Sequence, residues 1–168
     1  MTPEELSAAR RYIMKNEGRR AEVYFDSLGI PTIGVGFNLL RSDAREKIGA
    51  LDLDHDRLLG REQVLSDEQI EALFAADVCT AMRAAASLVP GWSTLAVARK
   101  TALIDMAFNL GAAGLAKFSR LIAAVNREQW DVAAAEIVNS RYARQVGPRA
   151  RRNALAIRLG DMAEETCE

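Results

Sequence analysis

The chain has 168 residues, of which 49% are hydrophobic and 27% charged, a balance typical of one folded globular domain and not of a disordered chain. It contains no apolar run long enough to span a membrane and no apolar N-terminal segment of the kind that makes a signal peptide. Its two cysteines are too few for a disulfide framework.

The net charge of −1 is unevenly distributed. Residues 1–82 hold 10 basic and 15 acidic side chains, whereas residues 83–158 hold 12 basic and 4 acidic ones. A basic half of this kind suits an anionic polymer, and on charge alone a cell-wall polymer and a nucleic acid fit equally well. A solvated helix face explains the same charges without any partner.

Residues 2–17 carry the signals of a helix. Positions 2–5 form a capping box in which Thr2 and Glu5 satisfy each other's backbone amides. An apolar stripe then runs at helical spacing to Glu17 in the last turn, and Gly18 follows as a natural stop. A carboxyl group in apolar surroundings keeps its proton more readily, which is what a general acid requires.

The following stretch predicts a β-hairpin. Polar and apolar residues alternate from residue 21 to Asp26, a turn follows at residues 27–29, and a second strand runs from Thr32 to Gly36. The glycines of this strand allow another backbone or a ligand to approach closely. Taken singly, Glu17 is explained as a surface charge and Asp26 as the cap of its own turn. The ordered set of Glu17, Asp26 and Thr32 is what indicates an active site.

Residues 37–65 are expected to form short helices and loops of a small lobe. Ser66 caps a long helix over residues 66–88, with Gln69 in the capping-box position. Cys79 is expected to be a small core residue, and His55 to lie in a solvated loop or at the start of a short helix. With this single histidine there is little material for a zinc site or a catalytic triad, and we expect no metal and no cofactor.

The rest of the sequence predicts helices only. Residues 94–110 are apolar nearly all round, which marks a helix buried in the core, and residues 111–114 would break it. Helices near residues 115–126, 130–139 and 141–145 precede a last helix from Pro148 to about residue 164. The expected fold class is therefore α+β and mainly α.

These motifs resemble the T-even-phage-type lysozymes, the endolysins of glycoside hydrolase family 24. The shared residues of the hairpin region are Glu17, Gly18, Arg20, Tyr24, Asp26, Gly29 and Thr32-Ile33-Gly34-Val35-Gly36. The likeness continues through residues 66–78, 99–111, 130–142 and 149–152. The resemblance implies one lysozyme-like domain of residues 1–168. It would have a small lobe at about residues 17–65, an interlobe helix at about 66–88, and a helical lobe at about 92–165 packed with the first helix.

The resemblance also implies an activity. Such a muramidase hydrolyses the β-1,4 bond between N-acetylmuramic acid and N-acetylglucosamine, with inversion. Glu17 would be the acid, while Asp26 and Thr32 would hold and activate the attacking water. Arg149 stands where the family has an arginine that pairs with the catalytic glutamate, although a helix-surface arginine would look the same in the sequence.

Further substrate contacts are implied along the rim of the site. Phe108 matches the family's cleft phenylalanine, although its apolar helix explains it equally well as a core residue. Asn38, Leu121 and Glu136 fall where the T-even enzymes have leucine, serine and asparagine at sugar and peptide contacts. Phe37 likewise replaces a structural histidine of the family.

Three other functions compete with this one. A lytic transglycosylase cleaves the same bond without water, and a silent module of the same fold would only bind peptidoglycan. A basic nucleic-acid binder would have a recognition motif that this chain lacks. The resemblance implies a monomeric endolysin, made in the host bacterial cytoplasm without stable membrane insertion, which reaches the peptidoglycan with the help of a holin. A virion-associated role is the alternative.

Overall fold

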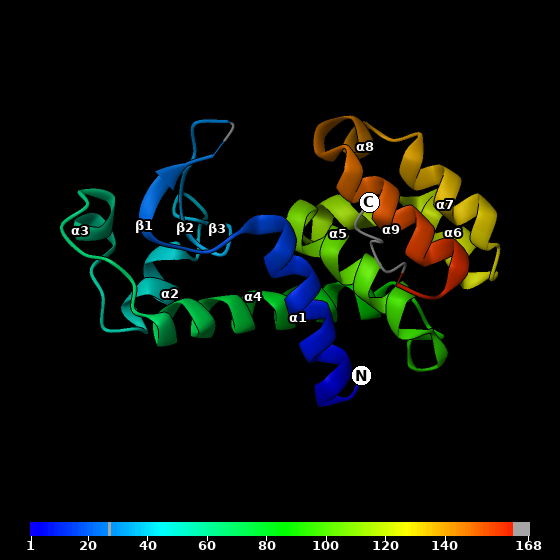
Figure 1. Cartoon of the computed structure of the whole chain (residues 1–168), viewed down its shortest axis with the longest axis horizontal. Helices are drawn as coiled ribbons and strands as arrows, with labels where there is room; N and C mark the ends of the chain where they lie inside the picture. The colour runs from blue at the N-terminus through cyan, green and yellow to red at the C-terminus, as the bar shows by residue number, and fades with distance from the viewer. Residues whose placement is uncertain (27, 163–168) are drawn as a thin grey trace, which may run out of the picture. The chain divides into compact units, whose positions relative to one another are not determined.

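The computed structural model describes residues 1–26 and 28–162 of the chain, so the predicted turn at residues 27–29 lies partly outside the described residues, and Cys167 lies wholly outside them. The chain divides into two compact units (Figure 1). The smaller unit is continuous and consists of residues 13–77, whereas the larger one combines residues 1–12 with the chain from residue 78 onwards. The expected organisation as one domain stays a prediction.

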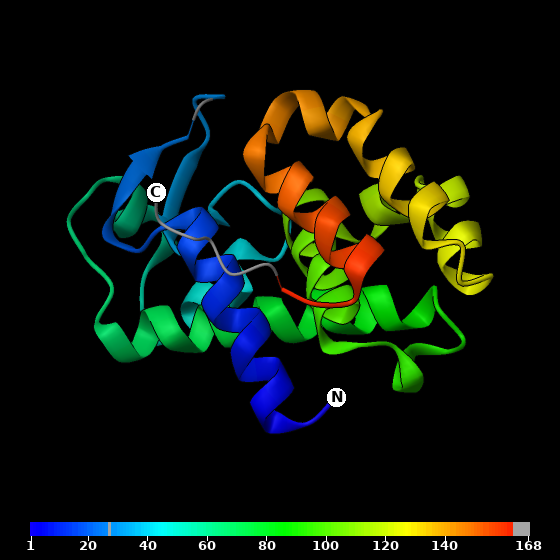
Figure 2. The ribbon, with the colours of Figure 1, turned by 45° about the vertical axis from the view of Figure 1, so that its right-hand side comes forward.

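The smaller unit contains the sheet. It begins with the end of helix α1 (Pro3–Glu17) and continues with strands β1 (Arg20–Phe25), β2 (Pro31–Gly34) and β3 (Phe37–Asn38), helices α2 (Ala44–Gly49) and α3 (His55–Leu59), and the first half of helix α4 (Asp67–Ser87). The three strands are antiparallel in the order β1-β2-β3 (Figure 2). The predicted hairpin is confirmed, whereas β3 falls in a region for which only helices and loops were expected.

The larger unit is helical throughout its described part. Its elements are the start of α1, the second half of α4, a short 3₁₀ helix at Trp92–Thr94, α5 (Val97–Ala116), α6 (Ser119–Asn126), α7 (Trp130–Val138), α8 (Arg141–Val146) and α9 (Pro148–Leu159). Helix α9 packs against α5, α7 and α8. Residues 101–107 of α5 are all buried, as its apolar sequence predicts, and Gly111 leaves the helical conformation at φ 72°, so the expected break is confirmed. The fold class, α+β and mainly α, is also confirmed.

The capping predictions hold in atomic detail. The Thr2 amide donates to Glu5 Oε2 at 2.8 Å and the Glu5 amide to Thr2 Oγ1 at 3.2 Å. Ser66 and Gln69 exchange the same pair of bonds at the start of α4, at 2.8 and 3.2 Å. The predicted end of the last helix is wrong, because α9 stops at Leu159, where Gly160 adopts the left-handed conformation that terminates helices.

Two single-residue expectations also change. His55 does begin a short helix, α3, but it is buried and not solvated, and its Nε2 lies 2.7 Å from the Leu39 carbonyl oxygen. Cys79 is partly exposed and not a core residue. No helix in the described part of the chain combines the length and apolar content that a membrane span requires.

A cluster of charges stabilises the smaller unit around Phe37. The Arg41 guanidinium lies 4.6 Å from the centroid of the buried Phe37 ring. It donates two hydrogen bonds to Asp77, at 2.6 and 2.9 Å, and two to Asp43, at 2.5 and 2.8 Å. Lys47 donates a further bond of 2.6 Å to Asp77. The hydrogen bonds from Arg41 hold the pKa of Asp43 well below its usual range, against the opposing effect of desolvation.

Replacing Arg41 with Met is therefore expected to lower the free energy of unfolding at pH 7 by about 2 kcal/mol, because Asp77 is nearly buried and loses its bidentate partner. The depressed pKa means that Asp43 stabilises the fold above about pH 4 and that this contribution is lost as the pH falls. Urea unfolding should thus show a difference in the free energy of unfolding between the parent and Arg41→Met that becomes smaller below pH 4. Arg45→Met, which removes an exposed ion pair with Asp56, is the matched control and should leave the free energy of unfolding almost unchanged.

Candidate active site

Glu17 lies at the last position of α1, where the chain turns towards the sheet. The helix ends there because Gly18 follows at φ 74°, with its amide still bonded to the Met14 carbonyl at 3.0 Å. One and two turns earlier, Ile13 and Ala9 are fully buried, as the apolar stripe predicts. The Glu17 side chain itself is half-buried. The helix therefore fixes the backbone of Glu17 and leaves part of its side chain in contact with solvent.

Gly36, in the turn between β2 and β3, borders the Glu17 carboxyl group. A Cβ atom built on Gly36 would lie 2.9 Å from Glu17 Oε2, and the residue has a φ of 68°. Glycine is needed here both for the left-handed backbone and for the space beside the carboxylate. The glycines of this strand predicted a close approach by another group, and at Gly36 that group is the Glu17 carboxyl.

Asp26 uses one of its two carboxylate oxygens to build the hairpin turn. Its Oδ1 accepts hydrogen bonds from the amides of Leu28, at 2.8 Å, and Ile30, at 2.9 Å. This is the self-capping role that an aspartate in a turn usually has. Oδ2 has no hydrogen-bond partner among the described residues. Asp26 is therefore held rigidly by one oxygen and presents the other as an acceptor.

Thr32 is buried on β2, and its hydroxyl hydrogen is already used. The Oγ1 atom donates to the Ile30 carbonyl oxygen at 3.0 Å, and the side chain is 4% exposed. With its hydrogen occupied, the hydroxyl oxygen can only accept a further hydrogen bond. Thr32 and Asp26 thus offer two acceptors and no donor, a combination that suits a water molecule donating both of its hydrogens.

Cross-strand register aligns a row of residues with Thr32. Tyr24 on β1 lies opposite Thr32, and Asn38 on β3 lies opposite Thr32 from the other side. Directly opposed residues share one face of a sheet, and Asp26, two positions after Tyr24, continues that face. Asn38 accepts a 2.7 Å hydrogen bond from the Leu40 amide through Oδ1 and is half-buried. The smaller unit therefore carries Asp26, Thr32 and Asn38 on a common face.

The remaining predicted contacts belong to the larger unit. Phe108 is half-buried on α5, so it is not a plain core residue. Glu136 on α7 pairs with Arg120 at 3.3 Å and lines a cavity of about 240 Å³ together with Phe118. Leu121 on α6 is 0% exposed. Its complete burial argues against a direct substrate contact at that position, because a leucine there fills the core.

Arg149 is buried at the start of α9 and makes an ion pair that the sequence did not reveal. Its Nε and Nη2 donate to the two oxygens of Asp105, each at 2.9 Å, and Asp105 is 0% exposed. Asn153 adds a 2.7 Å bond to Asp105 and a 3.1 Å bond to the Tyr142 hydroxyl, whose pKa is raised by burial. The alternative of a surface arginine is thus wrong, while the predicted pairing with Glu17 stays a prediction.

The signal for this network was an aspartate inside the apolar sequence of α5. A buried carboxylate needs a partner, so Asp105 predicts a cation nearby, although the sequence does not say which one. Elsewhere in the described residues no group of three His, Cys, Asp or Glu side chains is placed to hold a metal ion.

Comparison with known proteins agrees with this geometry. The phage lysozyme family matches residues 14–155. Two relatives are the probable T4-type lysozymes 2 and 1 of Dictyostelium discoideum, each 28% identical, over 95% and 94% of this chain and 98% and 97% of their own lengths. The pre-baseplate central spike protein Gp5 of Enterobacteria phage T4 is also 28% identical, over 89% of this chain, which spans only 27% of that longer protein.

The fold, with its small antiparallel sheet and many helices, and the family match over residues 14–155 together identify a lysozyme-type protein. The chain belongs to the phage lysozyme family.

Proposed function

We propose that this protein is a muramidase that hydrolyses the β-1,4 bond between N-acetylmuramic acid and N-acetylglucosamine, with inversion at the anomeric carbon. Membership of the phage lysozyme family supports a peptidoglycan hydrolase in general terms. The observation that carries the finer proposal is the pair of acceptors at Asp26 Oδ2 and Thr32 Oγ1, because it suits a water molecule that is to act as nucleophile.

The proposed reaction needs one proton donor and one proton acceptor. Glu17, protonated, transfers its proton to the glycosidic oxygen as the bond from that oxygen to the anomeric carbon breaks. A water molecule donates one hydrogen to Asp26 Oδ2 and the other to Thr32 Oγ1, so that a lone pair points away from both. As this oxygen bonds to the anomeric carbon, Asp26 takes the water proton. Glu17 ends ionised and Asp26 protonated, and exchange with solvent restores both.

The Asp26 turn supports this division of labour. Two backbone amides donate to Oδ1, which fixes the orientation of the carboxylate, while Oδ2 keeps its lone pairs for the water. Thr32 cannot donate to the water because its hydrogen is bonded to Ile30. The water therefore loses no lone pair to either group, as a nucleophile requires. A transglycosylase would have no use for this acceptor pair.

Product analysis tests the proposal. The purified protein is incubated with purified peptidoglycan, and the released fragments are examined for their ends and for the anomer formed first. Hydrolysis with inversion gives reducing ends with the α-configuration before mutarotation. Anhydro ends would instead identify a transglycosylase, and β-anomers a retaining hydrolase. Binding to the wall without any clearing would leave the silent peptidoglycan-binding module as the function.

A second part of the proposal concerns the biological setting of this activity. We infer a role in host lysis, with a monomeric protein made in the bacterial cytoplasm and admitted to the wall by a holin, and with no nucleic acid as a partner. Its similarity to the T4 spike protein supports a virion-associated role as the second candidate. Lysis that requires a coexpressed holin would support the first role, whereas presence of the protein in purified virions would support the second.

A further inference from the structure

One side chain in the cross-strand row beside Thr32, that of Tyr24, has no role in the proposed mechanism. Tyr24 lies directly opposite Thr32 and two positions before Asp26, so it shares a face with both proposed water ligands. It is only partly buried. Among the described residues its hydroxyl has no hydrogen-bond partner. A phenol hydroxyl that is left unused beside a catalytic pair is available to a ligand.

The charges around Tyr24 keep this hydroxyl neutral. Burial raises the pKa of Tyr24, and the negative charges of Glu17 and Asp26 raise it further, against the opposing effect of Arg20. Both proposed catalytic carboxylates therefore help to keep the Tyr24 hydroxyl protonated. A protonated phenol both donates and accepts one hydrogen bond, as the hydroxyl groups of a sugar do.

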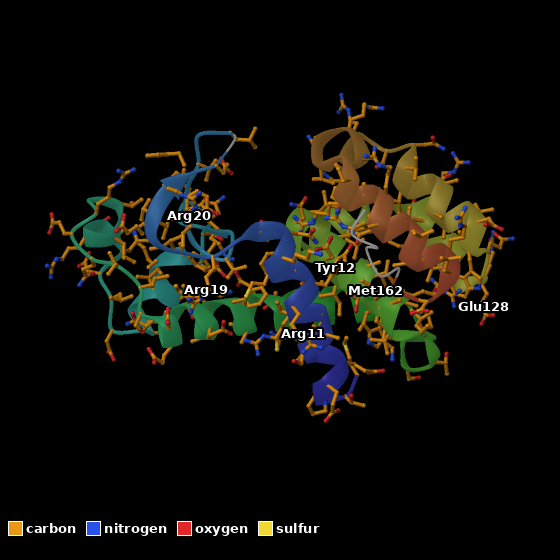
Figure 3. All side chains as sticks on the ribbon, viewed as in Figure 1. Arg11, Tyr12, Arg19, Arg20, Glu128 and Met162 are labelled. Atoms are coloured by element: carbon orange, nitrogen blue, oxygen red, sulfur yellow. The ribbon has the colours of Figure 1, made fainter. Side chains whose placement is uncertain are left out.

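Arg20 holds the tyrosine ring in place. Its guanidinium carbon lies 5.0 Å from the centroid of the Tyr24 ring, within the range of a cation–π contact. Arg20, which is labelled in Figure 3, has no ion-pair partner in the described part of the chain that would draw it away from the ring. The register of β1 against β2 shifts between Arg20 and Tyr24, as in a β-bulge, and bulges redirect side chains next to active sites.

There is open space beside this segment. Residues 20–24 line a cavity of about 310 Å³ along β1, a size within the usual range for a small-ligand site. The cavity wall is thus the bulged stretch that ends in Tyr24. Tyr24 is therefore both a lining residue of this cavity and a member of the cross-strand row that contains Thr32.

We propose that Tyr24 is a saccharide-binding residue, whose hydroxyl exchanges a hydrogen bond with the N-acetylated sugar that is attacked by the water at Asp26 and Thr32. This assignment rests on the proposed function for its substrate class. It assigns no proton transfer to Tyr24. Tyr24 contributes to binding, and Arg20 is the positioning residue that keeps its ring oriented.

The test is a binding measurement that does not depend on turnover. The probe is a soluble tetrasaccharide of alternating N-acetylglucosamine and N-acetylmuramic acid, titrated calorimetrically into Glu17→Gln and into the same variant carrying Tyr24→Phe. Loss of one hydrogen bond should raise Kd about 3- to 10-fold. In the enzyme with Glu17 intact, Tyr24→Phe should raise KM by a similar factor and leave kcat almost unchanged.

The control is Phe25→Leu, which alters the neighbouring side chain on the opposite face of β1 and should leave Kd unchanged. Equal affinity of Glu17→Gln with and without Tyr24→Phe would overturn the assignment, and so would a Glu17→Gln protein that does not bind the tetrasaccharide. Failure of the intact chain to clear peptidoglycan, combined with tetrasaccharide binding that depends on Tyr24, would refute the hydrolase and keep the binding residue. Unfolding midpoints of the variants show that each is folded.

Discussion

Glu17→Gln should lower the rate of peptidoglycan clearing by about 10²- to 10⁴-fold, the usual contribution of a general acid. The amide is nearly isosteric with the carboxyl group but has no proton to give to the leaving oxygen. The substitution leaves α1 intact, because Glu17 is the last residue of the helix. The rate is followed as the fall in turbidity of a peptidoglycan suspension, with the unfolding midpoint measured in parallel.

Glu46→Gln is the matched control for this experiment. Glu46 is an exposed carboxylate on α2 in the same unit, so the change removes one negative charge without touching the candidate site. Its clearing rate should equal that of the parent. Substantial clearing by Glu17→Gln would show that another group protonates the leaving oxygen.

Gly36→Ala is expected to reduce clearing at least tenfold, although the fold survives. The added methyl group would lie 2.9 Å from Glu17 Oε2, so the carboxyl group must move away from its position. A flexible side chain moves at little cost in stability, but general acid catalysis depends on placement to within a fraction of an ångström. The left-handed backbone adds a separate cost of about 1–2 kcal/mol to the free energy of folding.

Gly29→Ala separates these two effects. Gly29 has a φ of 74°, close to the 68° of Gly36, but a Cβ on it would meet nothing within 4 Å. Both variants should therefore lose similar stability in urea, whereas only Gly36→Ala should lose clearing activity beyond that of Gly29→Ala. Equal activity of the two variants would mean that the Gly36 backbone does not fix the Glu17 carboxyl group.

Local signals in the sequence predicted much of the fold. The capping boxes at Thr2 and Ser66 predicted helix starts because a short motif satisfies the orphaned amides by itself. The end of α9 was missed because the left-handed conformation of Gly160 stops the helix before its helix-compatible sequence ends. Strand β3 was missed because two residues give no measurable alternation, so its pairing with β2 is decided by the sheet.

The sequence predicted which residues form the candidate site, but not which of their atoms are already hydrogen-bonded. The sequence placed Asp26 and Thr32 near one turn, which the hairpin register now bears out. It could not show that Oδ1 of Asp26 accepts hydrogen bonds from the turn amides, or that the Thr32 hydroxyl donates to the Ile30 carbonyl oxygen. Both facts depend on the backbone geometry of the hairpin. The Asp105–Arg149 pair joins residues 44 positions apart, which no local pattern encodes.

The division of the chain into two units also sets the order in which its parts can fold during synthesis. The unit of residues 13–77 is continuous, so all of it can leave the ribosome and fold while the remainder is still being translated. Residues 1–12 precede this unit, yet their partners lie much later in the chain. Glu5 pairs with Lys100 at 3.5 Å, and the Tyr12 hydroxyl donates to Asn153 at 2.8 Å. The first turns of α1 can therefore pack only after residues up to 153 have been made, and their apolar stripe stays exposed until then.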